Sequence, residues 1–474
     1  MPLILGTNSI KDTGFNVDNS LLFEGGGNFL FRTQSSGNRR TLTISFWVKR
    51  SKIDDRQSLN SCTVDGSNET FIWFDTDNTL FVKNSASGST DFEIRTNRLF
   101  RDVSAWYHIV VAIDTTQGTA SNRVKIYING QQESSFSSAS YPSQNFDTRW
   151  NENNKKINIG REEYNAEFFN GYMCEHVMID GQQLAPDQFG EFDDNSGIWK
   201  PIDVSGLTFG TNGFYLQFKE SGTGTNASGM GADTSGNTNH FTVNFQAIYQ
   251  KVDTCTNNFA TMNPLDNFYA SSTFSEGNTN IVTDASSKAT NTSTFGINSG
   301  KWYCEIKAVQ IYNGNAQFGI KGKVSTSTSD GVGEGTDGYC YTASGGNKIN
   351  NGSASSFGTT WNNNDIIGIA VDLDNNKLYF SRNGTWQNSG DPTSGATGTG
   401  SAFNIGTPSS GFYFIATSDN DTSGGSANNY LFNFGNAPFT ISSGNTDGNG
   451  YGNFEYAVPS GYFSLNTKNL AEYG

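Results

Sequence analysis

The clearest hydrophobic pattern in the chain lies in residues 106–130. In residues 106–113, WYHIVVAI, both alternating sets of side chains are largely apolar, which is typical of a strand covered on both faces. In residues 123–128, RVKIYI, the apolar side chains alternate strictly and mark one inward face. Asn129-Gly130 supplies the two positive φ angles of a type I′ turn, so a further short strand should begin at Gln131. The pattern predicts a central hairpin of a β-sandwich.

A second hairpin is predicted at residues 365–384, DIIGIAVDLDNNKLYFSRNG. Its first strand carries Ile or Val at every second position from Ile367, residues 372–376 turn the chain, and the second strand ends at Asn383-Gly384. Residues 300–307, GKWYCEIK, alternate in the same way and predict another strand with one buried face. The second half of the chain therefore has a sheet of its own.

Composition supports an all-β chain. The hydrophobic fraction is only 34%, but the 474 residues include 36 Phe, so a few large side chains on short strands carry the apolar burial. The 54 Gly against 9 Pro, with many Asn, Ser and Thr, are typical of many turns and little helix.

Four motifs of the first half occur in the order found in one family. They are LTISFWVK (residues 42–49), WYHIVV with YING, INIG (157–160) and FNGYMCEHVMI (169–179). Together they resemble the laminin-G or concanavalin A-like jelly roll, over about residues 20–200. The segment LAPDQF (184–189) resembles the short helical turn that comes next in this family.

The second half resembles the SPRY (B30.2-like) sandwich, over about residues 296–439. The motifs are GKWYCEI, FGI, GYCY, DIIGIAVDLD with LYFSRNG, and LFNFGNAPF. The Gly/Ser/Thr-rich insert at residues 388–401 departs from the family pattern, and its role is open.

These patterns predict an all-β fold of two antiparallel β-sandwich, jelly-roll-like domains in tandem, with very little helix. The expected boundaries are an N-terminal arm at 1–19, a first sandwich at 20–250, a linker at 251–290 and a second sandwich with a C-terminal extension at 291–474. The arm either docks on a neighbouring protein or forms a first edge strand.

The net charge of the chain limits the classes of partner that it is expected to bind. A net charge of −15 and a pI near 4.6 argue against nucleic acid or an anionic membrane as a partner, because both attract cationic surfaces. The start of the chain lacks the pattern of a signal peptide and no segment is long and apolar enough for membrane insertion, so we expect a soluble protein made in a cytoplasm. The five cysteines show no metal-binding spacing, and most of them are expected to be buried thiols inside strands.

Catalytic chemistry is not expected. The three histidines lie far apart, no E-x-D-x-E glucanase pattern occurs, and Glu162, Glu163 and Glu167 are expected in a solvated loop. No cofactor is expected either. Asp75 and Asp77 are weak calcium candidates, but Asp and Asn also suit the turn in which they lie.

The module order, with TNNFATMNPL between the modules and PSGYFSLNTKNL near the end, resembles virion-associated proteins of marine tailed phages. This resemblance implies a non-enzymatic virion structural protein, of tail-fibre or surface-decoration type, made in the host cytoplasm. Its modules would bind a host-surface glycan or protein. The alternatives are a free carbohydrate-binding, lectin-like protein and a glycan depolymerase.

The expected ligand-binding residues are Tyr312, Trp361 and Trp386, aromatic residues outside the strand alternation of the SPRY-like half. The alternative is that the two tryptophans plug the ends of the sandwich. Without heptads or β-helix repeats, the chain needs its sandwich faces or the arm for assembly. We expect a homo-oligomer, with a trimer favoured, or attachment to other virion proteins.

Overall fold

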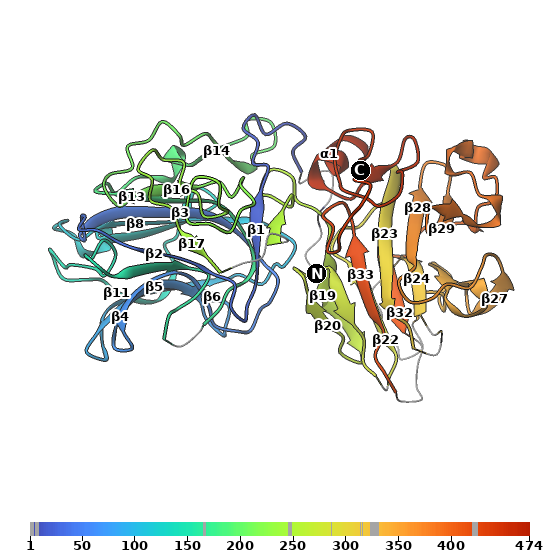
Figure 1. The fold of residues 1–474 in the computed structure, drawn as a ribbon, viewed down its shortest axis with the longest axis horizontal. Coiled ribbons are helices and arrows are strands. Elements are labelled where there is room, and N and C mark those ends of the chain that lie inside the picture. The colour runs from blue at the N-terminus through green and yellow to red at the C-terminus, as the bar shows by residue number, and fades with distance from the viewer. Residues whose placement is uncertain are drawn as a thin grey trace. The chain divides into compact units, whose positions relative to one another are not determined.

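The computed structural model of the chain describes residues 4, 9–164, 167–244, 249–285, 287–312, 314, 316–322, 331–419 and 425–474. The chain forms two compact units (Figure 1). We call residues 13–257 the first sandwich, and residues 258–474 together with residues 1–12 the second sandwich. The expected arm at 1–19 is therefore divided between the two units at Thr13.

The first sandwich is built from two eight-stranded sheets. One sheet contains, in order, β10 (Gln131–Gln132), β9 (Val124–Ile128), β8 (Tyr107–Asp114), β3 (Thr41–Arg50), β13 (Asn170–Asp180), β1 (Ser20–Glu24) and β18 (Gln250–Lys251), with β16 (Phe214–Leu216) paired to β13. The other contains β11 (Phe136–Ser140), β7 (Ser89–Leu99), β6 (Thr79–Ala86), β5 (Asn68–Phe74), β4 (Gln57–Asp65), β12 (Lys156–Ile159), β2 (Leu30–Thr33) and β17 (Thr242–Val243). A small hairpin of β14 (Gly190–Phe192) and β15 (Trp199–Pro201) and the 3₁₀ turns η2 (Ala120–Asn122) and η3 (Pro186–Gln188) complete the unit.

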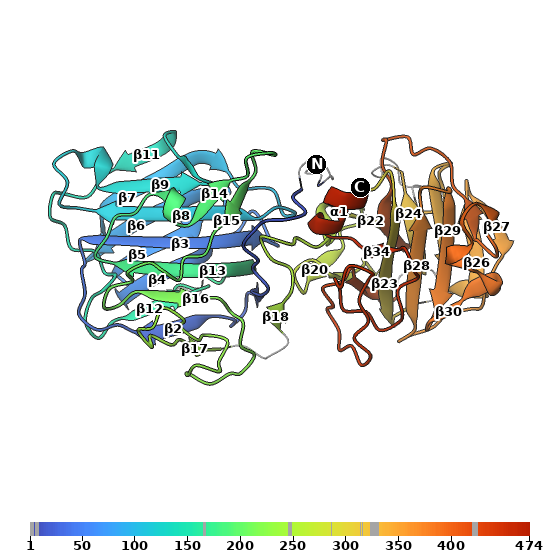
Figure 2. The same cartoon turned by 90° about the horizontal axis from the view of Figure 1, so that it is seen from above.

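The predicted central hairpin is confirmed. Strands β8 and β9 pair antiparallel, Asn129 and Gly130 have φ angles of 48° and 77°, and β10 comes directly after them. Alternate residues of both strands enter the core, where they meet side chains of the opposite sheet such as Ile72 and Val82. Figure 2 shows β3, β8 and β13 side by side in one layer.

The second sandwich also has two sheets. The first contains, in order, β19 (Met262–Tyr269), β22 (Ala289–Ser293), β32 (Phe414–Asp419), β24 (Ala316–Lys321), β25 (Gly338–Thr342), β26 (Asn347–Asn350) and β27 (Ser353–Ser356). The second contains β20 (Thr273–Ser275), β21 (Asn280–Val282), β33 (Asn429–Asn433), β23 (Lys301–Gln310), β28 (Ile366–Asp372), β29 (Lys377–Arg382) and β30 (Thr385–Trp386). Strand β31 (Phe403–Asn404) pairs with β29, and β34 (Phe463–Ser464) pairs parallel with β23.

The predicted linker at 251–290 differs from the structure. Strands β19, β20 and β21 lie entirely within this range, and they join both sheets of the second sandwich. Strand β22, which lies between β19 and β32, also begins there. The second sandwich thus starts at Asn258, about thirty residues before the predicted boundary at 291.

The insert at 388–401 is folded. It contains the 3₁₀ turn η7 (Pro392–Thr397) and most of η6 (Gln387–Ser389), and the Tyr462 hydroxyl donates to the carbonyl of Pro392 at 2.9 Å. The C-terminal extension ends in α1 (Thr467–Tyr473), whose N-terminus is capped by Asn466. A further short 3₁₀ turn, η5 (Ser344–Gly346), comes after β25. No helix in the described part of the chain is long and apolar enough to cross a membrane. The all-β prediction of tandem sandwiches with very little helix is confirmed.

Candidate functional site

A pocket of about 550 Å³ lies beside the loops of the second sandwich. Its lining residues come from three segments: Ile311, Gly314, Ala343, Ser344, Thr360, Trp361, Asn362 and Asn363. Pockets for small ligands have volumes of about 300–1,000 Å³. The size therefore suits one or two sugar rings or a short peptide segment.

Backbone hydrogen bonds join the three segments around the pocket. The amide of Ile311, just after β23, donates to Oδ1 of Asn363 at 2.8 Å. The amide of Ser344 donates to the carbonyl of Gly314 at 3.1 Å, and the amide of Trp361 donates to the carbonyl of Ala343 at 3.4 Å. The ends of β23 and β25 thereby hold the residue 360–363 loop in place.

Trp361 does line this pocket, but its ring is only 1% exposed. The indole stacks on Phe318 at 4.6 Å between ring centroids, and Tyr341 lies beside it at 6.1 Å. The prediction of an exposed stacking platform is wrong for Trp361, because the sandwich interior covers the ring. Its Nε1 is buried as well and has no hydrogen-bond partner among the described residues. Because this atom has almost no accessible surface, the side chains that a ligand in the pocket can reach are those of exposed residues such as Asn362 and Asn363.

Tyr312 is half-buried and comes directly after the pocket residue Ile311 without lining the pocket itself. Its amide donates to Oδ1 of Asn428 at 2.6 Å, and its ring packs on Gly425. Tyr312 therefore follows a pocket residue in the sequence but is not part of the described pocket lining.

Trp386 lies in a different environment. Its half-buried ring lies 6.4 Å from Tyr303 and 6.5 Å from Tyr379, in a cluster that also contains Phe454 and Tyr462 of the extension. The structure does not bring Trp386 to the pocket of Trp361. The three predicted residues thus do not form one aromatic surface.

Among the residues that the structure describes, those that line the pocket carry no titratable side chain. Their polar side chains are the hydroxyls of Ser344 and Thr360 and the amides of Asn362 and Asn363. Such neutral donors and acceptors can fix the hydroxyls of a sugar or a peptide backbone, but they cannot supply a general acid or base.

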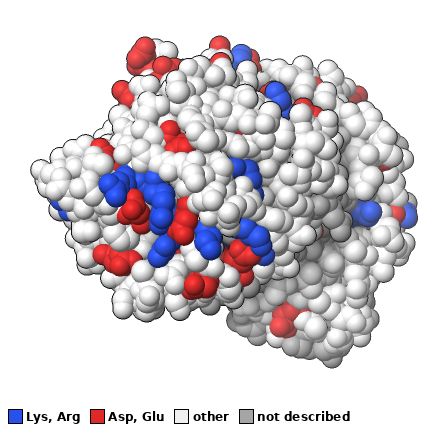
Figure 3. Space-filling model, turned by 60° about the vertical axis from the view of Figure 1, so that its left-hand side comes forward, with Lys and Arg blue, Asp and Glu red and all other residues white. Residues whose placement is uncertain are grey.

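The calcium candidates on the first sandwich are ion-paired. Asp75 accepts from Arg56 at 3.1 Å and from Arg95 at 2.8 Å, and Asp77 accepts from Arg95 at 2.9 Å. Positive and negative side chains interleave on this unit (Figure 3). For calcium to bind at this turn, the ion pairs of Arg95 with Asp75 and Asp77 would have to break. Among the residues that the structure describes, no group of three or more His, Cys, Asp or Glu is placed to hold a metal ion.

A carboxyl pair beside β4 and β5 was missed in the sequence. Glu162 is fully buried rather than solvated, and it accepts from Thr63 Oγ1 at 3.1 Å. Glu69 pairs with Thr63 across the two strands, and its Oε2 is buried without a hydrogen-bond partner. Burial, together with the charge of Glu162, raises the pKa of Glu69 to about 7. Only the folding of the 160–164 loop onto β4 reveals this pair, so no local motif could have shown it.

Two buried histidines have structural roles. His108 contacts Ser45 Oγ at 2.8 Å and accepts from Trp199 Nε1 at 2.9 Å, and His176 contacts Asn60 at 3.2 Å. Burial lowers the pKa of both imidazoles to about 3, so both are neutral near pH 7.

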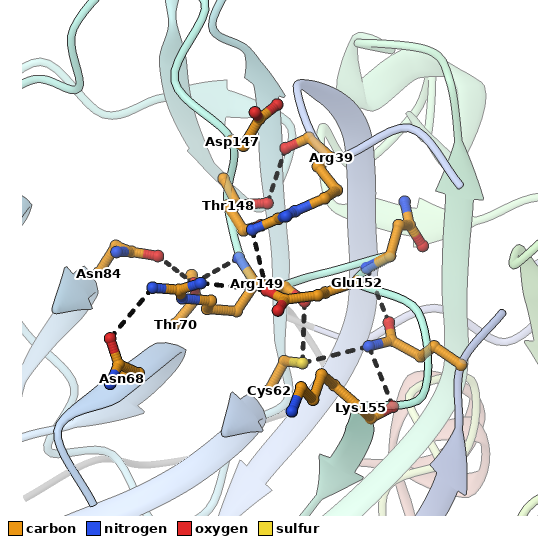
Figure 4. Close-up of polar contacts among 12 residues, drawn as sticks. Arg39, Cys62, Asn68, Thr70, Asn84, Asp147, Thr148, Arg149, Glu152 and Lys155 are labelled. Atoms are coloured by element: carbon orange, nitrogen blue, oxygen red, sulfur yellow. Dashed lines mark hydrogen bonds and ion pairs between the residues drawn. The ribbon is translucent and has the colours of Figure 1, made fainter. Parts of the chain in front are cut away.

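The thiol of Cys62 belongs to a polar cluster that joins the loop before β12 to β4, β5 and β6 (Figure 4). It donates to the carbonyl of Arg149 at 2.9 Å, and the guanidinium of Arg149 contacts Glu152 at 3.2 Å and Asn68 at 3.1 Å. Burial raises the pKa of the Cys62 thiol to about 12. The Cys62 thiol is buried and already donates to a backbone carbonyl, so this cluster is a structural brace.

Comparison with known families agrees with the geometry of the two units. A family model described as the concanavalin A-like lectin/glucanases superfamily matches residues 23–187, and a SPRY domain model matches residues 301–403. The chain carries a concanavalin A-like domain and a SPRY domain. Both resemblances inferred from sequence motifs are thereby confirmed. The pocket beside Trp361 belongs to the SPRY domain, and the Glu69 and Glu162 pair to the concanavalin A-like domain.

Solved structures of low sequence identity resemble parts of the chain. The SPRY domain of human HERC1 is 14% identical, with 36% of this chain and 96% of that chain covered and a TM-score of 0.29. A heptameric SAP-like pentraxin from Limulus polyphemus is 18% identical, with 36% and 80% covered and a TM-score of 0.27. A Bacteroides ovatus protein named as carbohydrate binding is 15% identical, with 49% and 59% covered and a TM-score of 0.34. At these TM-scores the likenesses carry no argument about function. No curated protein matches the chain.

Proposed function

We propose that this chain is a non-enzymatic virion structural protein, of tail-fibre or surface-decoration type, whose SPRY domain binds a host-surface glycan in the pocket beside Trp361. The observation that carries the binding role is the set of exposed, neutral polar side chains among the described residues of this pocket, namely Ser344, Thr360, Asn362 and Asn363. Glycan hydroxyls would exchange hydrogen bonds with the amides of Asn362 and Asn363. The proposed role needs no cofactor.

The substitution Asn362→Ala tests the site. Alanine removes the side-chain amide of an exposed pocket residue and leaves the packing of Trp361 on Phe318 intact, so the fold should remain while one ligand hydrogen bond is lost. We expect binding to host cells or to arrayed neutral glycans to weaken roughly 5- to 10-fold, the equivalent of one hydrogen bond. The melting temperature should change little.

The matched control is Asn298→Ala, which removes an exposed amide outside the described pocket lining and should leave binding intact. Equal binding by wild type and Asn362→Ala would exclude the pocket as the ligand site, whatever the protein's location.

The virion location has its own test. Mass spectrometry of purified particles should detect the chain at a fixed copy number relative to other virion proteins. If the chain occurs in the infected-cell lysate but not in particles, it is instead a free carbohydrate-binding protein.

The carboxyl pair of the concanavalin A-like domain favours a second candidate, a glycan depolymerase. Glu69 has the raised pKa of a general acid, the charge of Glu162 contributes to that rise, and Thr63 contacts both residues; most glycoside hydrolases cleave glycosidic bonds with two carboxyl groups. Release of reducing sugar from host polysaccharide, abolished by Glu69→Gln, would establish this activity. Persistent release in the Glu69→Gln variant would assign it to a contaminant.

A further inference from the structure

Two cysteines of the first sandwich lie in contact, although they are 81 positions apart in the sequence. Cys174 is a buried residue of β13, and Cys255 is a half-buried residue of the segment after β18. Their Sγ atoms are 3.5 Å apart, and both side chains belong to one cluster with Trp47 and Tyr172. At this distance no other side chain separates the two thiols.

The segment that carries Cys255 is held firmly on the sheet. Asp253 forms an ion pair with Lys49 at 2.7 Å, with both side chains at most 1% exposed, and accepts from Trp106 Nε1 at 3.2 Å. On the other side of Cys255, Thr256 accepts from the amide of Val17 at 3.0 Å. Breaking a buried ion pair is strongly unfavourable, so these contacts hold Cys255 opposite Cys174.

We propose that Cys174 and Cys255 are a latent disulfide, which closes when the protein meets a peroxide such as hydrogen peroxide. A disulfide requires a sulfur–sulfur distance of about 2.05 Å, so the two side chains need to approach by about 1.5 Å, which small side-chain rotations supply.

The reaction balances in two steps. The Cys255 thiolate attacks one peroxide oxygen, the O–O bond breaks, and Cys255 becomes a sulfenic acid while the second oxygen leaves as water after taking a proton. The Cys174 sulfur then attacks the Cys255 sulfur and the sulfenic oxygen leaves as a second water. Two thiols are oxidised by two electrons and one peroxide is reduced to two waters. Cys255 acts first because it is the more exposed of the pair.

The remaining cysteines serve as internal controls. Cys304 and Cys340 are buried in the second sandwich, and Cys62 is buried in its own polar cluster. Each of them should stay reduced at peroxide concentrations that close the pair.

The experiment treats the intact, folded protein with a titration of hydrogen peroxide and measures its mass and thiol content. We expect a loss of about 2 Da, the two hydrogens of one disulfide, with no gain of oxygen. Peptide mapping without reduction should link the peptides that contain residues 174 and 255, and dithiothreitol should reverse the link. Burial raises the pKa of both thiols, so closure should be faster at pH 9 than at pH 7.

Closure should also raise the melting temperature of the first sandwich by about 5–10 °C, because the cross-link restricts a long loop in the unfolded chain. Cys255→Ser should show neither the link nor this rise, whereas Cys340→Ser should show both. Oxidation of Cys255 to a sulfinic acid without a link would overturn the proposal. A link that joins two chains, or unchanged thiols after treatment, would overturn it equally. The mapping uses the wild-type protein, so it decides the question even if a variant folds poorly.

Discussion

Glu175 is a buried carboxyl in the middle of β13, and its backbone is in the left-handed region with φ of 51°. The hydroxyl of Tyr215 donates to its Oε2, and Gln217 donates to the same hydroxyl at 3.2 Å. Burial raises the pKa of Glu175 to about 7, with smaller contributions from the charges of Asp203 and Asp18. The folded protein thus holds a proton that the unfolded chain releases above about pH 4.5.

The raised pKa of Glu175 determines in which direction the free energy of unfolding changes with pH. Because the folded-state pKa is raised, the contribution of Glu175 to stability is complete below about pH 4.5 and is lost as the pH rises through about 7. The loss amounts to roughly 3 kcal/mol. Glu175→Gln keeps a neutral side chain at every pH, so we expect its free energy of unfolding to exceed that of wild type at pH 8 and to match it more closely at pH 5.

Urea unfolding at several pH values between 5 and 8 measures this difference. The exposed Glu191 offers a control, since Glu191→Gln should track the wild-type curve at every pH. Parallel curves for wild type and Glu175→Gln would show that the carboxyl is already charged in the folded protein.

Some predictions made from the sequence for single residues were wrong, because these residues are buried rather than exposed. Trp361 and Glu162 lie outside regular strands, and such residues are usually exposed, yet both are buried. Their burial comes from contacts with distant segments, Phe318 for one and Thr63 for the other. No local pattern of polar and apolar positions carries that information.

At the scale of elements, the hairpins followed by Asn-Gly turns could be predicted from the sequence, whereas mainly polar strands could not. Asn129-Gly130 and Asn383-Gly384 adopt positive φ angles and join β9 to β10 and β29 to β30, at the ends of the two predicted hairpins. Strands β4 (QSLNSCTVD) and β22 (ATNTS) were missed because they are mainly polar. Both are nevertheless largely buried, since neighbouring strands satisfy their backbone and polar groups. Strand β22 and its neighbours are also why the domain boundary was placed too late.

A pair of fragments tests this boundary. Residues 258–474 retain β19 to β22 and should fold with a cooperative melting transition. Residues 291–474 lose β19, β20, β21 and the first two residues of β22, which leaves β33 without β21, leaves β22 without β19 and shortens the strand that pairs with β32. Because unpaired strand edges promote aggregation, we expect the shorter fragment to be insoluble or unfolded.

Circular dichroism and thermal melting of the two fragments, expressed in parallel, make the comparison. A shorter fragment that melts cooperatively at the same temperature as the longer one would place β19 to β21 outside the folding unit.

At the scale of the whole molecule, we expect assembly as a homotrimer, with a light-scattering mass of about three times 51.5 kDa. Within residues 1–12, Ile4 pairs with Phe295 and Lys11 forms an ion pair with Glu472 at 2.6 Å. Deleting residues 1–12 removes no residue of the first sandwich. If residues 1–12 mediate trimer formation, the deletion should lower the light-scattering mass. Lys11→Ala removes the ion pair alone and should assemble as wild type. A deletion variant of unchanged mass would leave the sandwich faces as the assembly surface.

The division of the chain at Thr13 also has a consequence for the order of folding during synthesis. The first sandwich is continuous in sequence, so it can fold while the ribosome is still translating the residues after Asn257. Ile4 has to wait for Phe295, which at typical translation rates is made roughly 15–60 s later. Throughout that interval Ile4 lacks its native partner, and a chaperone or a second nascent chain has its best opportunity to bind it.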